Sequence, residues 1–234
     1  KLTNGCTERA ETLSKYFSSV FTVEPENVQE YSSTHSIKKS LSTIAITEDQ
    51  VLHKLLDIDC SKSPGPDNVH PRILKEMAHE LSGILTSIFN TSIQSGQLPE
   101  EWKLADITAI FKKGDRCLPE NYRPISLTSI ICKLLEGIIR DNIINHLKDN
   151  KLLSSKQFGF LKGRSTTLQL LKILDDWTEI LESGDLIDVV YTDFQKAFDT
   201  VPHRRMLTKL EAYGINGNLL EWIRSFLTNR KQRV

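Results

Sequence analysis

Apolar side chains recur at helical spacing through most of the chain. An apolar face from about Thr7 to Phe21 predicts a first short helix. Thr47 and Gln50 have the spacing of a capping box, which predicts that a second helix begins there. Further helices are predicted at about 71–96, 128–147, 168–181, 203–213 and 218–227. Helices therefore outweigh strands in the predicted structure.

Two apolar segments have the composition of strands instead. Residues 105–111 lead into a charged tip, and the β-branched residues of 186–191 lead directly into Asp193. Because these strands are far apart in the sequence, the pattern predicts an α+β fold and not alternating βαβ units. The polar residues 24–42 have no sustained period and are predicted to form a linker.

Two segments have the composition of functional loops. Residues 62–68 (KSPGPDN) are predicted to form a rigid turn, because two prolines fix φ while Gly65 supplies freedom between them. Residues 157–167 are rich in glycine and basic side chains, and Ser165 or Thr166 is placed to cap the following helix.

Composition excludes several classes of protein. The 234 residues are 39% apolar and 26% charged, which excludes fibrous, collagenous and wholly disordered proteins. The four cysteines form no C-x-x-C pair, so neither a zinc site nor a disulfide framework is predicted, and a reducing compartment is expected. No segment approaches the ~18 apolar residues of a membrane span. The chain starts at Lys1 and stops at Val234 without a closing turn, so we expect a fragment.

The formal net charge of zero conceals an uneven distribution. Residues 171–199 hold eight acidic side chains against two lysines, whereas 151–167 hold four basic side chains and no acid. Residues 203–234 hold seven basic side chains against two acids. An acidic site beside basic segments is the layout that a polymerase or nuclease needs, because phosphates must be held near a metal ion.

The segment 188–199 (DVVYTDFQKAFD) carries the strongest chemical signal. A carboxylate at the end of a buried strand, as predicted for Asp193, is well placed as a Mg²⁺ ligand, since Mg²⁺ binds one or two carboxylates together with substrate phosphates. The alternative is an acidic, solvated turn after a strand, and the pattern alone does not separate the two.

Residues 193–199 (DFQKAFD), followed by His203, resemble the first palm motif of reverse transcriptases from non-LTR (LINE-type) retrotransposons, with the jockey-like branch as the closest likeness. Residues 62–67, 102–115, 121–127 (NYRPISL) and 157–166 resemble further motifs of that family in the same order. The resemblance covers about 46–234. It implies a right-hand polymerase fold with fingers, an incomplete palm and no thumb, and it leaves residues 1–45 as a partly flexible connector.

The resemblance also implies roles for the residues of this motif. Asp193 would be a catalytic carboxylate that binds Mg²⁺, with Mn²⁺ as the alternative ion, and the carbonyl of Phe194 would add an oxygen ligand. The backbone of Lys196 and Ala197 would face the incoming triphosphate. Phe198 would lie under the sugar and exclude a 2′-hydroxyl; its alternative is a core aromatic residue.

The resemblance also implies roles for three basic side chains and one acidic side chain around Asp193 and the nucleotide. The resemblance implies that Arg123 contacts the triphosphate, a task that suits a planar five-donor group. Lys112 or Lys113 would add a point charge there, although a lysine pair is also typical of an exposed hairpin tip. Asp199 would be an orienting or helix-capping carboxylate.

The loop formed by residues 157–167, called here the basic loop, is the candidate contact for template or primer. Lys162 and Arg164 flank Gly163, which would permit close approach of a phosphate backbone. The alternative is a solvated surface loop.

Two palm motifs of the family, a Gln-Gly loop and an Asp-Asp hairpin, are not found in the sequence. Asp175 and Asp176 do not replace the latter, because they lie in a predicted helix. One carboxylate cannot hold two Mg²⁺ ions, so we expect this polypeptide alone not to polymerise. Two hypotheses compete with a reverse transcriptase. One is a degenerate remnant that binds nucleic acid, and the other is a generic Mg²⁺ nuclease.

The resemblance implies several partners. These are an RNA template, a DNA primer at the chromosomal target, dNTPs, and the remainder of a retrotransposon polyprotein with an endonuclease upstream and the rest of palm and thumb downstream. No membrane partner is implied. The implied location is the nucleus at the site of action and a cytoplasmic ribonucleoprotein before that, and the protein is not expected to be secreted.

Overall fold

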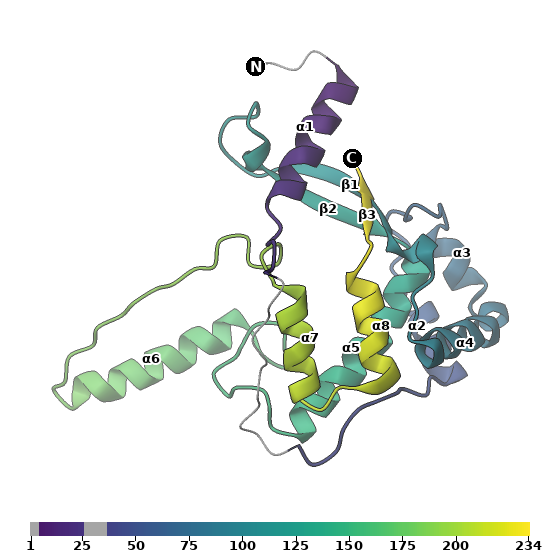
Figure 1. The fold of residues 1–234 in the computed structure, drawn as a ribbon. Helices are drawn as coiled ribbons and strands as arrows, with labels where there is room; N and C mark the ends of the chain where they lie inside the picture. Colours follow the sequence, from purple (N-terminus) through teal and green to yellow (C-terminus); the bar gives the residue numbers. More distant parts are fainter. Residues whose placement is uncertain (1–4, 26–36) are drawn as a thin grey trace.

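The computed structural model describes residues 5–25 and 37–234, which form α-helices and one three-stranded sheet (Figure 1). The helices are α1 (Cys6–Ser19), α2 (Glu48–Leu56), α3 (Pro71–Glu76), α4 (Ala78–Ser95), α5 (Ile130–Asp149), α6 (Thr166–Glu182), α7 (His203–Ala212) and α8 (Gly217–Leu227). The strands are β1 (Leu104–Phe111), β2 (Tyr122–Thr128) and β3 (Lys231–Arg233), and two short 3₁₀ helices, Glu100–Lys103 and Pro119–Asn121, precede β1 and β2. The predicted α+β content is confirmed.

Local sequence signals set several helix ends. The capping box predicted for α2 is present, since the Thr47 side chain accepts from the Gln50 backbone and the Gln50 side chain accepts from the Thr47 backbone. The Ser165 hydroxyl accepts from the Leu168 N–H and caps α6, as one of the two predicted alternatives requires. Helix α4 ends at Gly96, whose φ of 66° is unfavourable for other residues.

The main core lies between α2, α4, α5, α7 and α8. Its fully buried side chains include Leu55, Phe89, Leu135 and Leu219. The segment that precedes α2 also contacts this core, since Leu41 forms an isolated parallel bridge with Ile215. Part of the predicted linker 24–42 is therefore docked on the helices, while its residues 26–36 lie outside the described residues.

The sheet has the order β2-β1-β3 and forms a second, smaller core with α1. Strands β1 and β2 are antiparallel, with Ala105 opposite Thr128, and β3 joins β1 in parallel. Phe17 of α1 is 3% exposed and packs with Ala105 and Ile107 of β1. Helix α1 therefore covers one face of the sheet, as Figure 1 shows.

The strand predicted at 186–191 does not form, and this prediction is wrong. The segment is extended but pairs with none of β1 to β3, and Leu186 and Val190 are 95% and 85% exposed. A single extended segment leaves its backbone groups without a ladder, so β composition alone cannot make it a strand.

Other boundaries differ in smaller ways. The helix predicted at 71–96 is divided at Met77, whose ψ of 24° leaves the helical region, and we find no contact that explains the break. Strands β2 and β3 were not predicted from periodicity. β2 alternates imperfectly, with both Ile125 and Ser126 exposed, and β3 is only three residues long.

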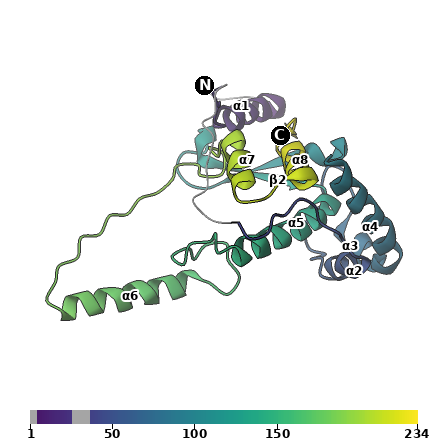
Figure 2. The same ribbon diagram turned by 60° about the horizontal axis from the view of Figure 1, so that its bottom comes forward.

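Helix α6 projects away from the rest of the chain in both views (Figures 1 and 2). None of its side chains is buried, and the apolar face formed by Leu171, Leu174 and Leu181 is exposed. Within 5–25 and 37–234, no helix has the length and apolar character needed to cross a membrane.

A buried polar contact joins α4 to α8, and its removal gives a testable result. The Trp222 indole N–H donates to the Ser92 hydroxyl over 2.9 Å, and that hydroxyl donates to the Gln97 carbonyl over 2.6 Å. We expect Ser92→Ala to lower the free energy of unfolding by about 1–3 kcal/mol, because it leaves a buried indole N–H unpaired. Chemical denaturation measures this. Ser87→Ala, on the exposed face of α4, is the control; equal effects in both variants would contradict the prediction.

Candidate active site

Asp193 lies where the extended segment enters a turn that precedes α7. Within residues 193–200, called here the 193–200 turn, the Lys196 carbonyl accepts from the Asp199 N–H over 2.9 Å and the Thr200 N–H over 3.1 Å. Lys196 has a φ of 49°, in the left-handed region that side chains other than glycine disfavour. Asp193 itself is exposed. The turn is therefore closed by its own backbone and presents the carboxylate to solvent.

The turn meets the basic loop through two aromatic rings. The Phe198 and Phe160 ring centroids lie 5.9 Å apart in an edge-to-face arrangement. Both rings are otherwise exposed, so Phe198 is not a core residue. The structure thus brings together two segments to which the sequence assigned nucleotide and template contacts.

The basic loop is organised by Arg164. Its guanidinium donates to the Gln157 carbonyl over 3.0 Å and to the Ser155 carbonyl, and it lies 4.9 Å from the Phe158 ring centroid. Gly163 has a φ of 81°, and an added Cβ would meet nothing within 4 Å. Backbone conformation alone therefore favours glycine here, and contact of Lys162, Gly163 or Arg164 with a phosphate stays a prediction.

The candidate triphosphate contacts lie on the β1–β2 hairpin. Arg123 is exposed on β2 opposite Ile110, on the sheet face that α1 does not cover. Lys112 and Lys113 are exposed just beyond β1, where the Lys112 N–H donates to the Asn121 carbonyl over 2.8 Å. The hairpin is therefore well ordered by its backbone and leaves all three cations available.

No hydrogen bond or ion pair among the described residues joins this hairpin directly to the 193–200 turn. Helix α1 contacts both instead. Tyr16 packs in the small core beside Phe17, and its hydroxyl accepts from the Lys196 ammonium over 2.8 Å. Tyr16 is not among the residues predicted from the sequence, because 180 residues separate it from Lys196 and no local signal marks it.

The described residues do not make a complete metal site. Among them, no group of three or more His, Cys, Asp or Glu side chains is arranged to hold an ion. Asp193 and the Phe194 carbonyl offer one charged and one neutral oxygen ligand, whereas phosphoryl-transfer metals need several. A metal bound here needs ligands beyond those that the described residues supply.

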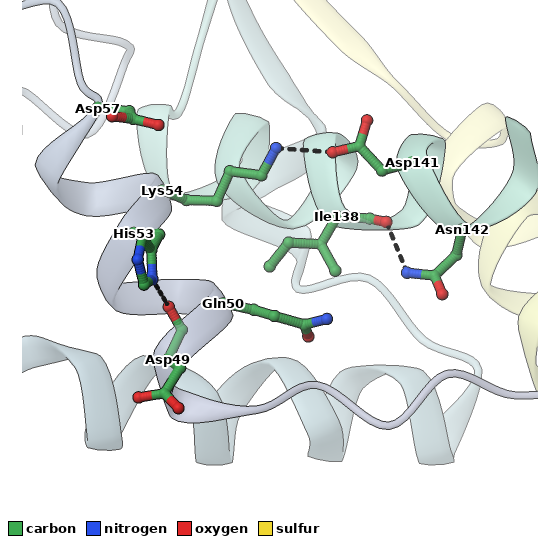
Figure 3. Close-up of a pocket in the computed structure, with 8 residues that line it drawn as sticks. All are labelled: Asp49, Gln50, His53, Lys54, Asp57, Ile138, Asp141 and Asn142. Atoms are coloured by element: carbon green, nitrogen blue, oxygen red, sulfur yellow. Dashed lines mark hydrogen bonds and ion pairs between the residues drawn. The ribbon is translucent and has the colours of Figure 1, made fainter. Parts of the chain in front are cut away.

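The structure also holds a pocket of about 330 Å³ between α2 and α5, and seven of its eight lining residues have polar side chains (Figure 3). At its edge the Lys54 ammonium lies 2.8 Å from the Asp141 carboxylate. Partial burial raises the pKa of Asp141, but hydrogen bonds from Lys54 and Arg140 outweigh this and leave it below its ordinary value. None of the sequence-predicted site residues lines this pocket.

A second hollow of about 510 Å³ lies between α5, α7 and α8 and is mainly apolar. Its lining includes Ile143, Met206, Leu210 and Phe226. It also contains none of the predicted site residues, so the 193–200 turn, the basic loop and the hairpin remain the candidate site.

Comparison with known proteins identifies relatives of this chain. The family described as reverse transcriptase (RNA-dependent DNA polymerase) matches residues 110–234. This range includes the 193–200 turn, the basic loop, and Lys112, Lys113 and Arg123 of the β1–β2 hairpin. A Drosophila melanogaster protein named "Probable RNA-directed DNA polymerase from transposon BS" is 30% identical over 79% of this chain and 21% of its own length. The "RNA-directed DNA polymerase from mobile element jockey" of the same species is 28% identical over 88% of this chain and 22% of its own. The chain spans about a fifth of the length of these relatives.

Proposed function

Because the chain belongs to the reverse transcriptase (RNA-dependent DNA polymerase) family, we propose that it is part of a non-LTR retrotransposon polymerase that copies RNA into DNA. The observation that carries the proposal is the family match over 110–234, since this range contains every candidate site residue. The names of the jockey and transposon BS relatives support the choice of element class.

We propose that the β1–β2 hairpin belongs to the fingers and that residues 186–200 belong to the palm. Two features support this assignment. The apolar segment 186–191 has no strand partner among the described residues, and the apolar face of α6 has no cover there. Both would be satisfied by further strands of a palm sheet, which would also fix Asp193 at a strand end. The division into a connector at 1–45 and a polymerase domain at 46–234 is part of the same proposal.

The proposed roles follow the chemistry of each group. Asp193 and the Phe194 carbonyl would bind Mg²⁺ or Mn²⁺ together with ligands that the described residues do not supply, and the ion would supply charge stabilisation for nucleotidyl transfer. Arg123 would pair with triphosphate oxygens through its planar donors, and Lys112 or Lys113 would add a point charge.

The remaining candidates would act around the nucleotide and the template. The backbone of Lys196 and Ala197 would face the triphosphate, and the Asp199 carboxylate would orient the turn or cap a helix. The basic loop would contact template or primer phosphates. RNA template, DNA primer, dNTPs, an endonuclease in the same polyprotein and action in the nucleus are all parts of the proposal.

A primer-extension assay tests the function. The protein encoded by the complete open reading frame that contains this chain is incubated with Mg²⁺, an RNA template, an annealed DNA primer and dNTPs. We expect template-dependent extension of the primer. A soluble, folded product that binds the annealed primer without extending it would support the non-catalytic remnant and overturn the polymerase.

The Phe198 ring gives a prediction about sugar selection. If it lies under the sugar, Phe198→Ala should raise the use of ribonucleotides relative to deoxynucleotides by about ten- to a hundredfold, because a pocket that merely excludes a group discriminates by that order. Ratios of kcat/KM for dNTP and rNTP measure the change. Phe160→Leu, which alters the ring packed on Phe198 but not Phe198 itself, is the control. Unchanged sugar selection in Phe198→Ala would remove Phe198 from this role.

A further inference from the structure

The N-terminal brace, defined as residues 6–25, contacts both halves of the candidate site. On one side Phe17 is buried against β1, the strand paired with the one that carries Arg123. On the other side Tyr16 contacts Lys196, and the Thr22 hydroxyl donates to the Thr200 carbonyl over 2.9 Å. The brace thus bridges the hairpin sheet and the 193–200 turn, which make no direct polar contact with each other among the described residues.

The contact between Tyr16 and Lys196 has two components. The Lys196 ammonium donates to the Tyr16 hydroxyl over 2.8 Å, and it also lies 4.6 Å from the centroid of the Tyr16 ring. The ring is itself held, because Tyr16 packs in the small core of α1 and β1. The Lys196 side chain is therefore anchored to a fixed point outside its own turn.

The anchored residue is the one whose backbone is strained. Lys196 has a φ of 49°, and its carbonyl accepts the N–H groups of Asp199 and Thr200. A left-handed conformation at a residue with a side chain persists only where the surroundings fix it. The Tyr16 contact provides such a constraint three residues after Asp193.

The brace also caps the helix that follows the turn. Helix α7 has no side-chain cap of its own at Pro202. Instead, the Glu24 carboxylate accepts from the Arg204 N–H over 2.9 Å and from the Arg205 N–H over 3.3 Å. A carboxylate at a helix N-terminus satisfies unpaired donors and is favoured by the helix dipole. The brace therefore holds the 193–200 turn at Lys196 and Thr200 and caps the helix that follows it.

We propose that Tyr16 is a positioning residue for the incoming nucleotide and acts through Lys196. By holding the Lys196 side chain it fixes the backbone of the turn, so that the Lys196 and Ala197 N–H groups keep their orientation toward the triphosphate. The inference rests on the proposed function for its nucleotide, but the coupling between α1 and the turn is measurable without any activity.

The first measurement uses this chain alone. Tyr16→Phe keeps the ring and its packing but removes the hydroxyl that accepts from Lys196. We expect backbone hydrogen exchange in 195–200 to become about fivefold faster, the factor that one ordinary net hydrogen bond makes in an equilibrium constant. Exchange in α4 should not change. Lys15→Ala, an exposed neighbour on α1, is the matched control and should leave the turn unaffected.

The second measurement uses the protein encoded by the complete open reading frame. Tyr16→Phe should raise the KM for dNTP about fivefold, with the kcat and the KM for primer–template unchanged, because only the orientation of the triphosphate contact is lost. In a Lys196→Met background, which lacks the ammonium, Tyr16→Phe should have no additional effect. A purely structural role would instead lower stability and act equally in both backgrounds.

The outcomes separate this inference from the proposed function. Faster exchange in 195–200 together with an absence of polymerase activity would remove the polymerase and leave the coupling in place. Normal polymerase activity with unchanged exchange and unchanged KM in Tyr16→Phe would overturn the positioning role. If Tyr16→Phe lowers the melting temperature, Lys196→Met tests the same contact by removing the ammonium. Unchanged hydrogen exchange in 195–200 of Lys196→Met would also overturn the positioning role of Tyr16.

Discussion

Replacing Asp193 by alanine is expected to abolish RNA-templated primer extension by the complete protein. Asp193 is the first of the two carboxylates in the 193–199 segment, which lies within the range matched by the family; it is exposed at the start of the turn, and we propose it as a metal ligand. A metal ion contributes several kcal/mol of transition-state charge stabilisation, so kcat should fall by about a thousandfold or more. Single-nucleotide extension under saturating dNTP measures this loss.

A matched control separates loss of the metal ligand from loss of negative charge. Asp175 is an exposed carboxylate on α6, and like Asp193 it belongs to the acidic residues of 171–199. Asp175→Ala should retain activity near that of the unmodified protein. The Asp193→Ala protein should also keep its melting temperature, because the side chain is exposed. Unchanged extension by Asp193→Ala would take this residue out of the active site.

Gly65→Ala is expected to destabilise the fold by about 3 kcal/mol, the upper part of the usual range for forcing an extra methyl group into a packed site. A Cβ on Gly65 would lie 2.5 Å from the Thr128 carbonyl oxygen and 2.7 Å from the Ser129 nitrogen. These are backbone atoms at the junction of β2 and α5, so no side chain can rotate out of the way. For a chain of this length the melting temperature should fall by about 6–12 °C.

Gly159→Ala provides the comparison for Gly65→Ala. An added Cβ at Gly159 would meet nothing within 4 Å, and its φ is not positive, so its effect should lie within about 0.5 kcal/mol. Thermal unfolding gives the melting temperatures of both variants and so tests the predicted difference. Equal melting temperatures would show that the 62–68 loop can move away from Thr128.

Gly65 also shows that the structure can give a different reason for a glycine from the one that the sequence suggests. Gly65 was expected to supply backbone freedom between two prolines, yet it does not have a positive φ, and its place is explained by close approach of another backbone. At Gly163 the φ of 81° by itself favours glycine, and close approach of a phosphate backbone there stays a prediction. Composition identifies where a glycine is needed, but only the neighbouring atoms decide why.

Helix ends were predictable because their causes are local. The capping box of Thr47 and Gln50, the Ser165 cap and the apolar spacing of α5, α7 and α8 all lie within a few residues of the element they define. The segment 186–191 has equally strong β composition, but a strand depends on a second segment for its hydrogen bonds. Its prediction therefore failed, whereas the predicted helices form, with the helix at 71–96 divided at Met77.

The sequence by itself determined the family, the main helices and the candidate chemistry around Asp193, Arg123 and Phe198, because these depend on the order and identity of residues within short segments. Only the tertiary structure decided how those segments are held. It placed Phe198 against Phe160 and tied Lys196 to Tyr16 across 180 residues. Contacts of this kind depend on how the whole chain packs, and no local pattern of residues encodes them.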